Sequence, residues 1–183
     1  MAKAMRIRDR GRVQRRHEAD SLLEKSGDMV LVDRGVLRSF VIRCPDDCGE
    51  TLTINLDPRT DKAWRYYKKR NQVSVFPSVW RDTGCGSHFI IWNHVIVWCD
   101  DKWGDRDVVV EEEARLRERA LSVCTPEWQH FTMIAEKLDE VPWDVNRACG
   151  YLAHHRGLLE EGKEKLRGSF RLKRLPDRTT RRF

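Results

Sequence analysis

The chain has 183 residues, of which 40% are hydrophobic, seven are tryptophan and 35% are charged. This length and composition support one good core or two small ones. No apolar run approaches the roughly 18 residues that a membrane-spanning helix needs, and residues 1–16 are too charged for a signal peptide. We therefore expect a cytosolic protein, in which six cysteines are metal ligands or buried thiols rather than disulfides.

Positive charge is concentrated at both ends of the chain. Residues 1–17 carry seven Lys or Arg against one acid, and residues 163–183 carry nine against two. Residues 1–28 lack clear periodicity, so we interpret them as a mobile basic arm, and residues 176–183 as a basic tail. Such ends bind nucleic-acid phosphates or acidic protein surfaces, or they fold back on an acidic body.

A β-rich domain is predicted over residues 29–105. Its first hairpin has strands at Leu37–Arg43 and Thr51–Leu56, with a cysteine-containing turn between them. A short edge strand is expected at Met29–Val32. A short helix is expected from Thr60 or Asp61 to Lys69, followed by a strand at Val73–Phe76.

A second hairpin is predicted near the end of this domain. Phe89–Trp92 and Val95–Trp98 flank Asn93-His94, which suits a two-residue turn. Both faces of this hairpin are apolar. We therefore expect it to form the buried centre of the domain.

Four of the six cysteines lie in two turns that precede or follow these strands. Cys44 and Cys48 are in the first turn, and Cys85 and Cys99 bracket the second hairpin. Zinc prefers a closed tetrahedral shell of sulfur and nitrogen ligands, which two such turns could supply together. We predict one structural zinc on these four cysteines, with His88 as the rival to Cys99. Cys124 and Cys149 should not take part.

Ser87 and His88 follow Cys85 closely and permit two interpretations. A serine becomes a good nucleophile when a base removes its proton, so the two could form a catalytic pair. In a regular strand they would point to opposite faces, so this pairing requires the turn at Gly84–Ser87 to break the alternation. Alternatively, Ser87 hydrogen-bonds a thiolate while His88 is a ligand or supports one.

The catalytic interpretation needs further groups. Backbone N–H groups of the Gly84–Ser87 turn could stabilise an oxyanion, and Asp47, Glu50 or Asp100 could orient the imidazole. The sequence does not choose among these carboxylates. In a zinc-dependent variant, metal-bound water would be the nucleophile and Glu50 the base.

The motifs in residues 40–99 resemble those of a bacterial domain family. They are F-x3-C-x3-C-G-E, L-x-I-N-L-x-P, P-S-V-W-x3-G-C-x-S-H-F-x-I and V-x-W-C, where G-C-x-S-H-F covers Gly84 to Phe89. This family is found in operons beside ubiquitin-activating-like, ubiquitin-conjugating-like and ubiquitin-like proteins. The resemblance implies a peptidase of a ubiquitin-like pathway, with cysteine-held zinc and Ser/His chemistry. Family members often have another cysteine where this chain has Asp46.

The remaining residues show helical periodicity. We expect helices at Asp107–Ser122, from Thr125-Pro126 to about Leu138, and from Pro142 to Gly157, followed by two short strands. This order resembles a winged helix-turn-helix domain over residues 106–175. The predicted fold class is therefore α+β, with a small zinc-binding domain followed by a winged-helix domain.

Two functions from different classes remain open. One is a serine-type or zinc-dependent peptidase that processes or removes a ubiquitin-like modifier. The other is a zinc-containing, winged-helix regulator that binds nucleic acid without catalysis, although winged helices also dock proteins. The residues expected to contact nucleic acid or a partner, from the third helix and the wing, are Arg147, Tyr151, His154, Lys163, Lys165, Arg167, Arg171 and Lys173.

Overall fold

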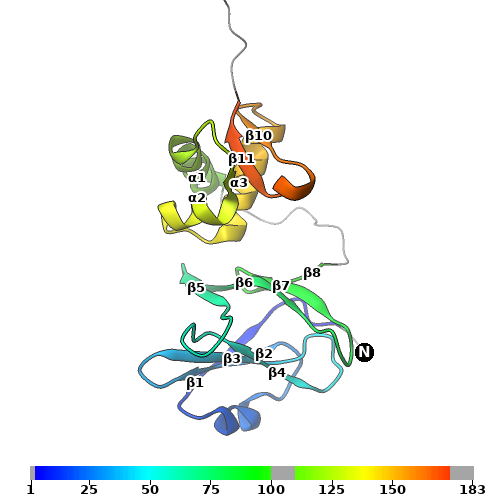
Figure 1. Cartoon of the computed structure of the whole chain (residues 1–183). Coiled ribbons are helices and arrows are strands. Elements are labelled where there is room, and N and C mark those ends of the chain that lie inside the picture. The colour runs from blue at the N-terminus through cyan, green and yellow to red at the C-terminus, as the bar shows by residue number, and fades with distance from the viewer. Residues whose placement is uncertain (1–2, 100–109, 174–183) are drawn as a thin grey trace, which may run out of the picture. The chain divides into compact units, whose positions relative to one another are not determined.

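The computed structural model describes residues 3–99 and 110–173, and the chain divides into two compact units, Met1–Gly104 and Asp105–Phe183 (Figure 1). The first unit is built from strands, and the second contains helices and a small sheet. The α+β class predicted from the sequence is confirmed. Among the described helices, none is long and apolar enough to cross a membrane.

The first sheet of the N-terminal unit has four strands in the order β1-β2-β3-β4. β1 runs parallel to β2, and the other neighbouring strands are antiparallel. A 3-10 helix, η1, connects β1 to β2. The bounds are β1 Arg8–Val13, η1 Arg16–Leu22, β2 Asp28–Asp33, β3 Leu37–Arg43 and β4 Thr51–Asn55.

The second sheet is an antiparallel meander in the order β5-β6-β7-β8. Two of its connections are two-residue turns, Arg70-Asn71 and Asn93-His94, in which both residues have positive φ. That geometry matches the right-handed twist of a hairpin, and it confirms the predicted turn at Asn93-His94. The bounds are β5 Arg65–Lys69, β6 Gln72–Trp80, β7 His88–Trp92 and β8 Val95–Trp98.

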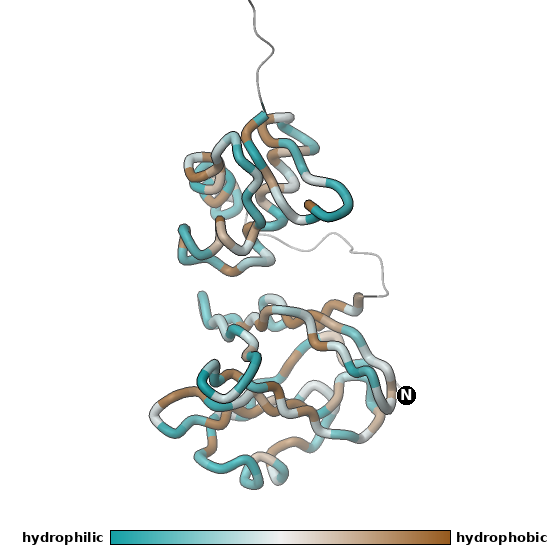
Figure 2. Tube along the Cα trace, viewed as in Figure 1, coloured by the Kyte–Doolittle hydropathy of each residue, from teal (hydrophilic) through white to brown (hydrophobic). Residues whose placement is uncertain are grey.

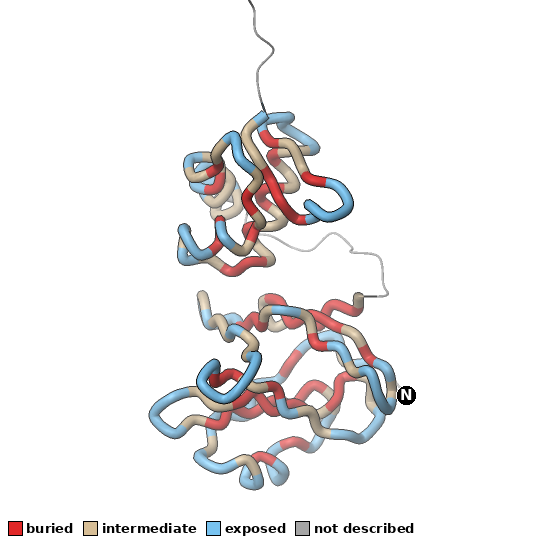
Figure 3. The backbone as a smooth tube through the Cα atoms, viewed as in Figure 1, coloured by how far each residue is buried: buried red, intermediate tan, exposed pale blue. Residues whose placement is uncertain are grey.

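The main core lies between these two sheets. Alternate residues of each strand point inward, so Phe40 and Ile42 of β3 meet Phe89 and Ile91 of β7 in one buried cluster. A smaller cluster on the other face of the first sheet packs Ala19 of η1 against its strands. Hydrophobic and buried segments follow the strands of both sheets (Figures 2 and 3). The second hairpin is buried, as predicted.

The structure differs from the expectation of a mobile basic arm over residues 1–28. The N–H groups of Ala4 and Ile7 donate to Pro45 and His94, and β1 then joins the first sheet. Ile7 is buried in the core between the sheets. The sequence does not predict this strand, because its exposed positions are mainly arginines and Ile7, just before it, is a single buried apolar residue.

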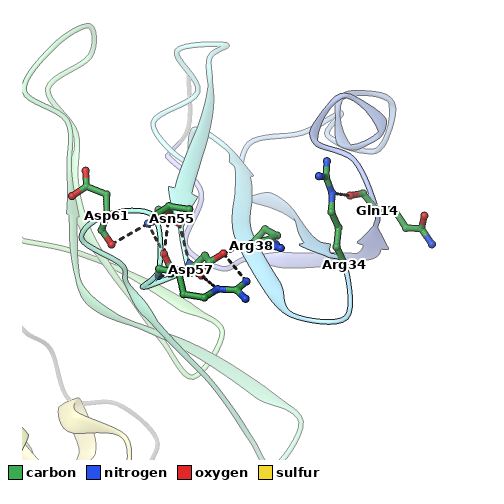
Figure 4. A network of polar contacts seen from close by, with 8 residues as sticks. Gln14, Arg34, Arg38, Asn55, Asp57 and Asp61 are labelled. Atoms are coloured by element: carbon green, nitrogen blue, oxygen red, sulfur yellow. Dashed lines mark hydrogen bonds and ion pairs between the residues drawn. The ribbon is translucent and has the colours of Figure 1, made fainter.

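The helix expected from residue 60 to Lys69 is also absent from the structure, where residues 65–69 form strand β5. Hydrogen bonds to β6 and the packing of Tyr66 on the core outweigh the weak helical pattern. The side chains of Asn55 and Asp57 hold the preceding loop by hydrogen bonds to its backbone (Figure 4). Asp57 also forms ion pairs with Arg38 and Arg59.

The C-terminal unit contains three helices and a three-stranded sheet in the order β10-β11-β9, within the described residues 110–173. The third predicted helix is present, and it begins with Pro142 at its first turn, where proline is favoured. The bounds are α1 Val110–Val123, β9 Gln129–His130, α2 Phe131–Leu138, α3 Pro142–His154, β10 Leu159–Glu161, η2 Glu164–Leu166 and β11 Ser169–Leu172.

The second helix starts later than the sequence suggested. Thr125-Pro126 was expected to begin it, but residues 125–128 form a turn and Gln129 pairs with β11. The His130 side chain accepts a hydrogen bond from the N–H of Thr132 and caps α2. An imidazole nitrogen therefore does what Ser, Thr, Asp or Asn usually does at a helix start, which is why the start was misplaced.

Candidate active site and thiol cluster

Two chain segments from different sheets meet at one end of the N-terminal unit. The first is the turn after β3, closed by the Cys44 N–H donating to the Glu50 carbonyl at 2.8 Å. The second is the turn between β6 and β7, closed by the Arg81 N–H donating to the Ser87 carbonyl at 2.9 Å. Together they bring one side of each sheet to a shared cluster of sulfur atoms.

The cluster consists of Cys44, Cys48 and Cys85, whose sulfur atoms all lie within 4.8 Å of one another. The Sγ atoms of Cys44 and Cys85 are 3.7 Å apart. Three thiols on one metal with sulfur bonds of about 2.3 Å would lie about 3.8 Å apart, because that is the edge of the tetrahedron. These three residues therefore fit as three of the four ligands of a thiophilic metal.

Polar groups surround the three sulfurs. The Ser87 hydroxyl lies 3.3 Å from Cys85 Sγ and 3.7 Å from Cys44 Sγ. Arg81 Nη1 lies 3.6 Å from Cys48 Sγ and 3.4 Å from Cys85 Sγ, while the other end of its guanidinium pairs with Glu50. The Cys85 thiol donates to the Ser87 hydroxyl, and Arg81 donates to sulfur, which favours thiolate.

Cys44 and Cys85 differ in how readily they ionise. Burial raises the pKa of Cys44 to about 11. Burial also acts to raise the pKa of Cys85, but hydrogen bonds with Ser87, Cys44 and Cys48 together lower the pKa of that thiol to about 7. Since a metal needs thiolates, its binding would release protons, among them that of Cys44.

The fourth predicted ligand is not part of the cluster. Cys99 is absent from the described group of three, and its backbone N–H donates to the His88 carbonyl at 3.0 Å. The residues between Cys85 and Cys99 include the β7–β8 hairpin. Cys124 and Cys149 are buried in the C-terminal unit and lie outside the cluster.

The structure keeps the alternation of strand residues at Ser87 and His88, so the two do not pair with each other. Ser87 is buried and its hydroxyl faces sulfur. His88 points to the opposite face of β7, where Nε2 lies 3.1 Å from the hydroxyl of Ser78. The expected Ser87–His88 pair is thus replaced by a Ser78–His88 pair.

Ser78 was missed by sequence reasoning, although it lies in the quoted motif P-S-V-W. Trp80 is directly opposite His88 across β6 and β7, and Ser78 is two residues before Trp80 on the same face. The spacing of ten residues between Ser78 and His88 gives no hint of contact. Only the register of the two strands makes them neighbours.

The backbone at Ser78 is held by a tryptophan. Trp64 Nε1 donates to the Ser78 carbonyl at 3.2 Å, and the Trp64 N–H donates to the Asn55 carbonyl at 2.8 Å. Asn55 and Asp57 in turn order the loop that precedes Trp64 (Figure 4). The L-x-I-N-L-x-P motif is therefore connected by hydrogen bonds to the Ser78–His88 pair.

The three carboxylates considered for orienting the imidazole have other positions. Glu50 pairs with Arg81, and Asp47 accepts a 2.5 Å hydrogen bond from Ser26. Asp100 lies outside the described residues. The turn that was expected to bind an oxyanion faces the sulfur cluster, because the Ser87 N–H interacts with Cys85.

The residues predicted to contact nucleic acid or a partner fall into two groups. Four of them interact within the C-terminal unit: Arg147 with Glu113, Tyr151 with Arg117, His154 with Glu161, and Arg171 with Glu160. The other four, Lys163, Lys165, Arg167 and Lys173, are exposed. The third helix therefore presents less free positive charge than its sequence suggested.

Comparison with known families finds one family to which the sequence of this unit is similar. Residues 15–99 match the model of a family described as bacterial ubiquitination-like system serine protease (BubE). The match covers a little under half of the chain and includes the thiol cluster, Ser78 and His88. It confirms the resemblance drawn from the sequence motifs. No curated protein and no solved structure matches the chain.

Proposed function

We propose that the N-terminal unit is a serine-type peptidase that processes a ubiquitin-like modifier or removes it from its targets. The observation that carries this proposal is the 3.1 Å contact between Ser78 Oγ and His88 Nε2. A serine and a histidine within hydrogen-bond reach are the minimum for nucleophilic acyl transfer. The name of the matching family supports both the serine chemistry and the pathway.

In the proposed mechanism, Ser78 Oγ attacks the scissile carbonyl carbon while His88 Nε2 takes the hydroxyl proton. The tetrahedral intermediate expels the amine, which receives that proton from His88, and an acyl-enzyme remains on Ser78. Water then attacks the acyl carbon while His88 takes its proton, the bond from that carbon to Ser78 Oγ breaks, Ser78 Oγ recovers the proton from His88, and the carboxylic acid leaves. Trp64 holds the Ser78 backbone throughout, so that the hydroxyl keeps its aim at the imidazole.

We assign a supporting part to the thiol cluster. Zinc is the metal that suits three clustered thiols, and it would be held by Cys44, Cys48 and Cys85. When bound, it would fix the turn that leads directly into His88. Ser87 belongs to this support, because its buried hydroxyl faces the sulfurs rather than the imidazole.

The experiment also tests two alternative nucleophiles. Ser87 would be the nucleophile if substrate binding turned it toward His88, and a zinc-bound water with Glu50 as base would need no serine. The Glu50–Arg81 pair disfavours the second, since the Glu50 carboxylate is already engaged by the Arg81 guanidinium. Each alternative predicts a different pattern of inactive variants.

The test uses a ubiquitin-like modifier with a C-terminal extension and an isopeptide-linked target. Ser78→Ala and His88→Ala should each lower kcat by at least about 1,000-fold, whereas Ser87→Ala should retain zinc and measurable activity. A fluorophosphonate probe should label Ser78 in the parent protein. Full activity in Ser78→Ala would refute the assignment, and loss of activity only in Glu50→Gln or with chelator would favour the zinc route.

A second candidate function concerns the C-terminal unit. Its order α1-β9-α2-α3-β10-β11 supports a winged-helix assignment, and Lys163, Lys165 and Arg167 form an exposed basic wing between β10 and β11. Such a wing favours binding to nucleic-acid phosphates. Binding in a gel shift should weaken steeply with salt and be lost in the triple Lys163→Glu, Lys165→Glu, Arg167→Glu variant. Unchanged binding in that variant would contradict this mode.

A further inference from the structure

The strand that carries Ser78 has an edge that no described strand covers. β5 pairs with β6 from Gln72 only as far as Phe76, which lies opposite Arg65. β6 continues to Trp80 and pairs there with β7 alone. Pro77–Trp80 therefore form an edge that pairs with no described strand, and on this edge the Ser78 carbonyl accepts from Trp64 Nε1 while the N–H and C=O of Trp80 have no such partner strand.

Backbone hydrogen bonds show which way this edge points. In an antiparallel ladder, hydrogen-bonded pairs alternate with pairs whose N–H and C=O groups face away. The Arg81 N–H donates to Ser87, and the His88 carbonyl accepts from Cys99 on β8. The Trp80–His88 pair is therefore the facing-away type, and the N–H and C=O of Trp80 point out from the sheet.

The side chain of Trp80 is also unusual. It is 70% exposed, the largest exposed fraction among the described large hydrophobic residues. It projects from the same face as Ser78, and its ring centroid is 6.0 Å from that of His88. An exposed indole is costly in solution but is a common anchor in peptide recognition, because it offers a large rigid contact area.

We propose that the substrate binds as an added β-strand along Pro77–Trp80, with the extended C-terminal segment of the ubiquitin-like modifier as the occupant. This proposal rests on the proposed peptidase function. Backbone pairing with Trp80 would align the scissile carbonyl with Ser78, and the indole would cover an adjacent substrate residue. Such pairing uses backbone hydrogen bonds rather than side-chain contacts, so the affinity for the substrate depends on an extended segment whose backbone amides are accessible.

The experiment uses peptides that span the C-terminal junction of the modifier, each with one backbone amide N-methylated. Loss of a paired amide should lower kcat/KM by about tenfold, and methylation of the next amide, which faces away, should have little effect. Trp80→Ala should lower kcat/KM by at least about tenfold, and Trp80→Phe should recover part of it. Leu22→Ala is the matched control, because Leu22 is also exposed.

Fluorophosphonate labelling separates this proposal from the peptidase assignment, because the probe reacts with the serine without using the strand edge. Trp80→Ala should be labelled at nearly the parent rate. Labelling without an alternating effect of N-methylation, or with cleavage unchanged in Trp80→Ala, would overturn the strand-addition proposal alone. Absence of both labelling and cleavage in the parent would overturn the peptidase assignment and this proposal with it.

Discussion

The turn between β6 and β7 has room for a guanidinium because residue 84 has no side chain. Gly84 has a φ of +67°, and a Cβ atom there would lie 2.7 Å from Nη2 of Arg81. Gly86 has a similar φ of +65° but open space around it. The two glycines thus share a backbone requirement and differ only in their neighbour.

We predict that Gly84→Ala destabilises the protein more than Gly86→Ala does. Both substitutions strain the backbone by about 1 kcal/mol, and the first also displaces Arg81 from the sulfur atoms, at a further cost of about 1 kcal/mol. Urea denaturation measures both. In an Arg81→Ala background the difference should vanish, and a difference that persisted there would contradict the explanation.

Asp57 is a buried carboxylate whose ionised form the fold requires. Hydrogen bonds from Arg59, together with Arg38, hold its pKa well below the usual value despite burial. Because the folded pKa is lower than the unfolded one, this group stabilises the fold above about pH 4 and loses that contribution as the pH falls further. Its partners place it at the base of the loop that leads to Trp64 (Figure 4).

Asp57→Asn should therefore be less stable than the parent at pH 7, and the gap should narrow below about pH 4. Denaturation midpoints at pH 7 and pH 3 test this. Asp61→Asn is the control, because Asp61 is exposed and its carboxylate accepts from the neighbouring N–H of Lys62. An equal difference in stability between Asp57→Asn and the parent at both pH values would show that the charge of Asp57 does not contribute.

At the scale of elements, the N-terminal segment closes the unit across both sheets. The Ile7 N–H bonds to the turn between β7 and β8, and β1 then continues beside β2. Arg8 and Arg10 both pair with the fully buried carboxylate of Asp28. These contacts make the segment part of the fold rather than an appendage.

Ile7→Ala should cost about 2–5 kcal/mol of unfolding free energy, as expected for truncating a buried side chain. Met5→Ala should change it by less than about 0.5 kcal/mol, because Met5 is 59% exposed. Chemical denaturation compares the two. Equal, small effects would restore the view of residues 1–28 as an arm.

For the whole molecule, the thiol cluster links the first sheet, through Cys44, to the second sheet, through Cys85. The core between the sheets is extensive, so the fold does not depend on the cluster alone. A metal bound there would add stability by mass action, since it binds the folded unit. The bound metal would stabilise the turn that leads into His88.

The purified protein should hold one zinc per chain, and Cys48→Ser should lose it together with at least about 2 kcal/mol of stability. Cys99→Ser should keep the zinc, because Cys99 lies outside the cluster. Elemental analysis and denaturation measure both. Zinc lost from Cys99→Ser as well as from Cys48→Ser would favour the four-cysteine ligand set expected from the sequence.

Much of the fold follows from local sequence. Asn93-His94 and the apolar runs on either side of it specified the β7–β8 hairpin. Alternation specified β3 and β4, and Pro142 with a periodic apolar face specified α3. Each of these signals acts over a few residues, because turn conformation and strand or helix periodicity depend on near neighbours. The cysteines and the Ser-His motif likewise located the functional region.

Which side chains meet there was decided only by the tertiary structure. The β6–β7 register opposed Trp80 to His88 and so joined His88 to Ser78, while strand alternation sent Ser87 to the sulfurs. Likewise, Cys99 lies outside the cluster of three thiols, and residues 8–13 form a strand by pairing with β2. Such contacts depend on long-range register, which periodicity cannot encode, because shifting a strand by one residue exchanges its faces without changing its pattern.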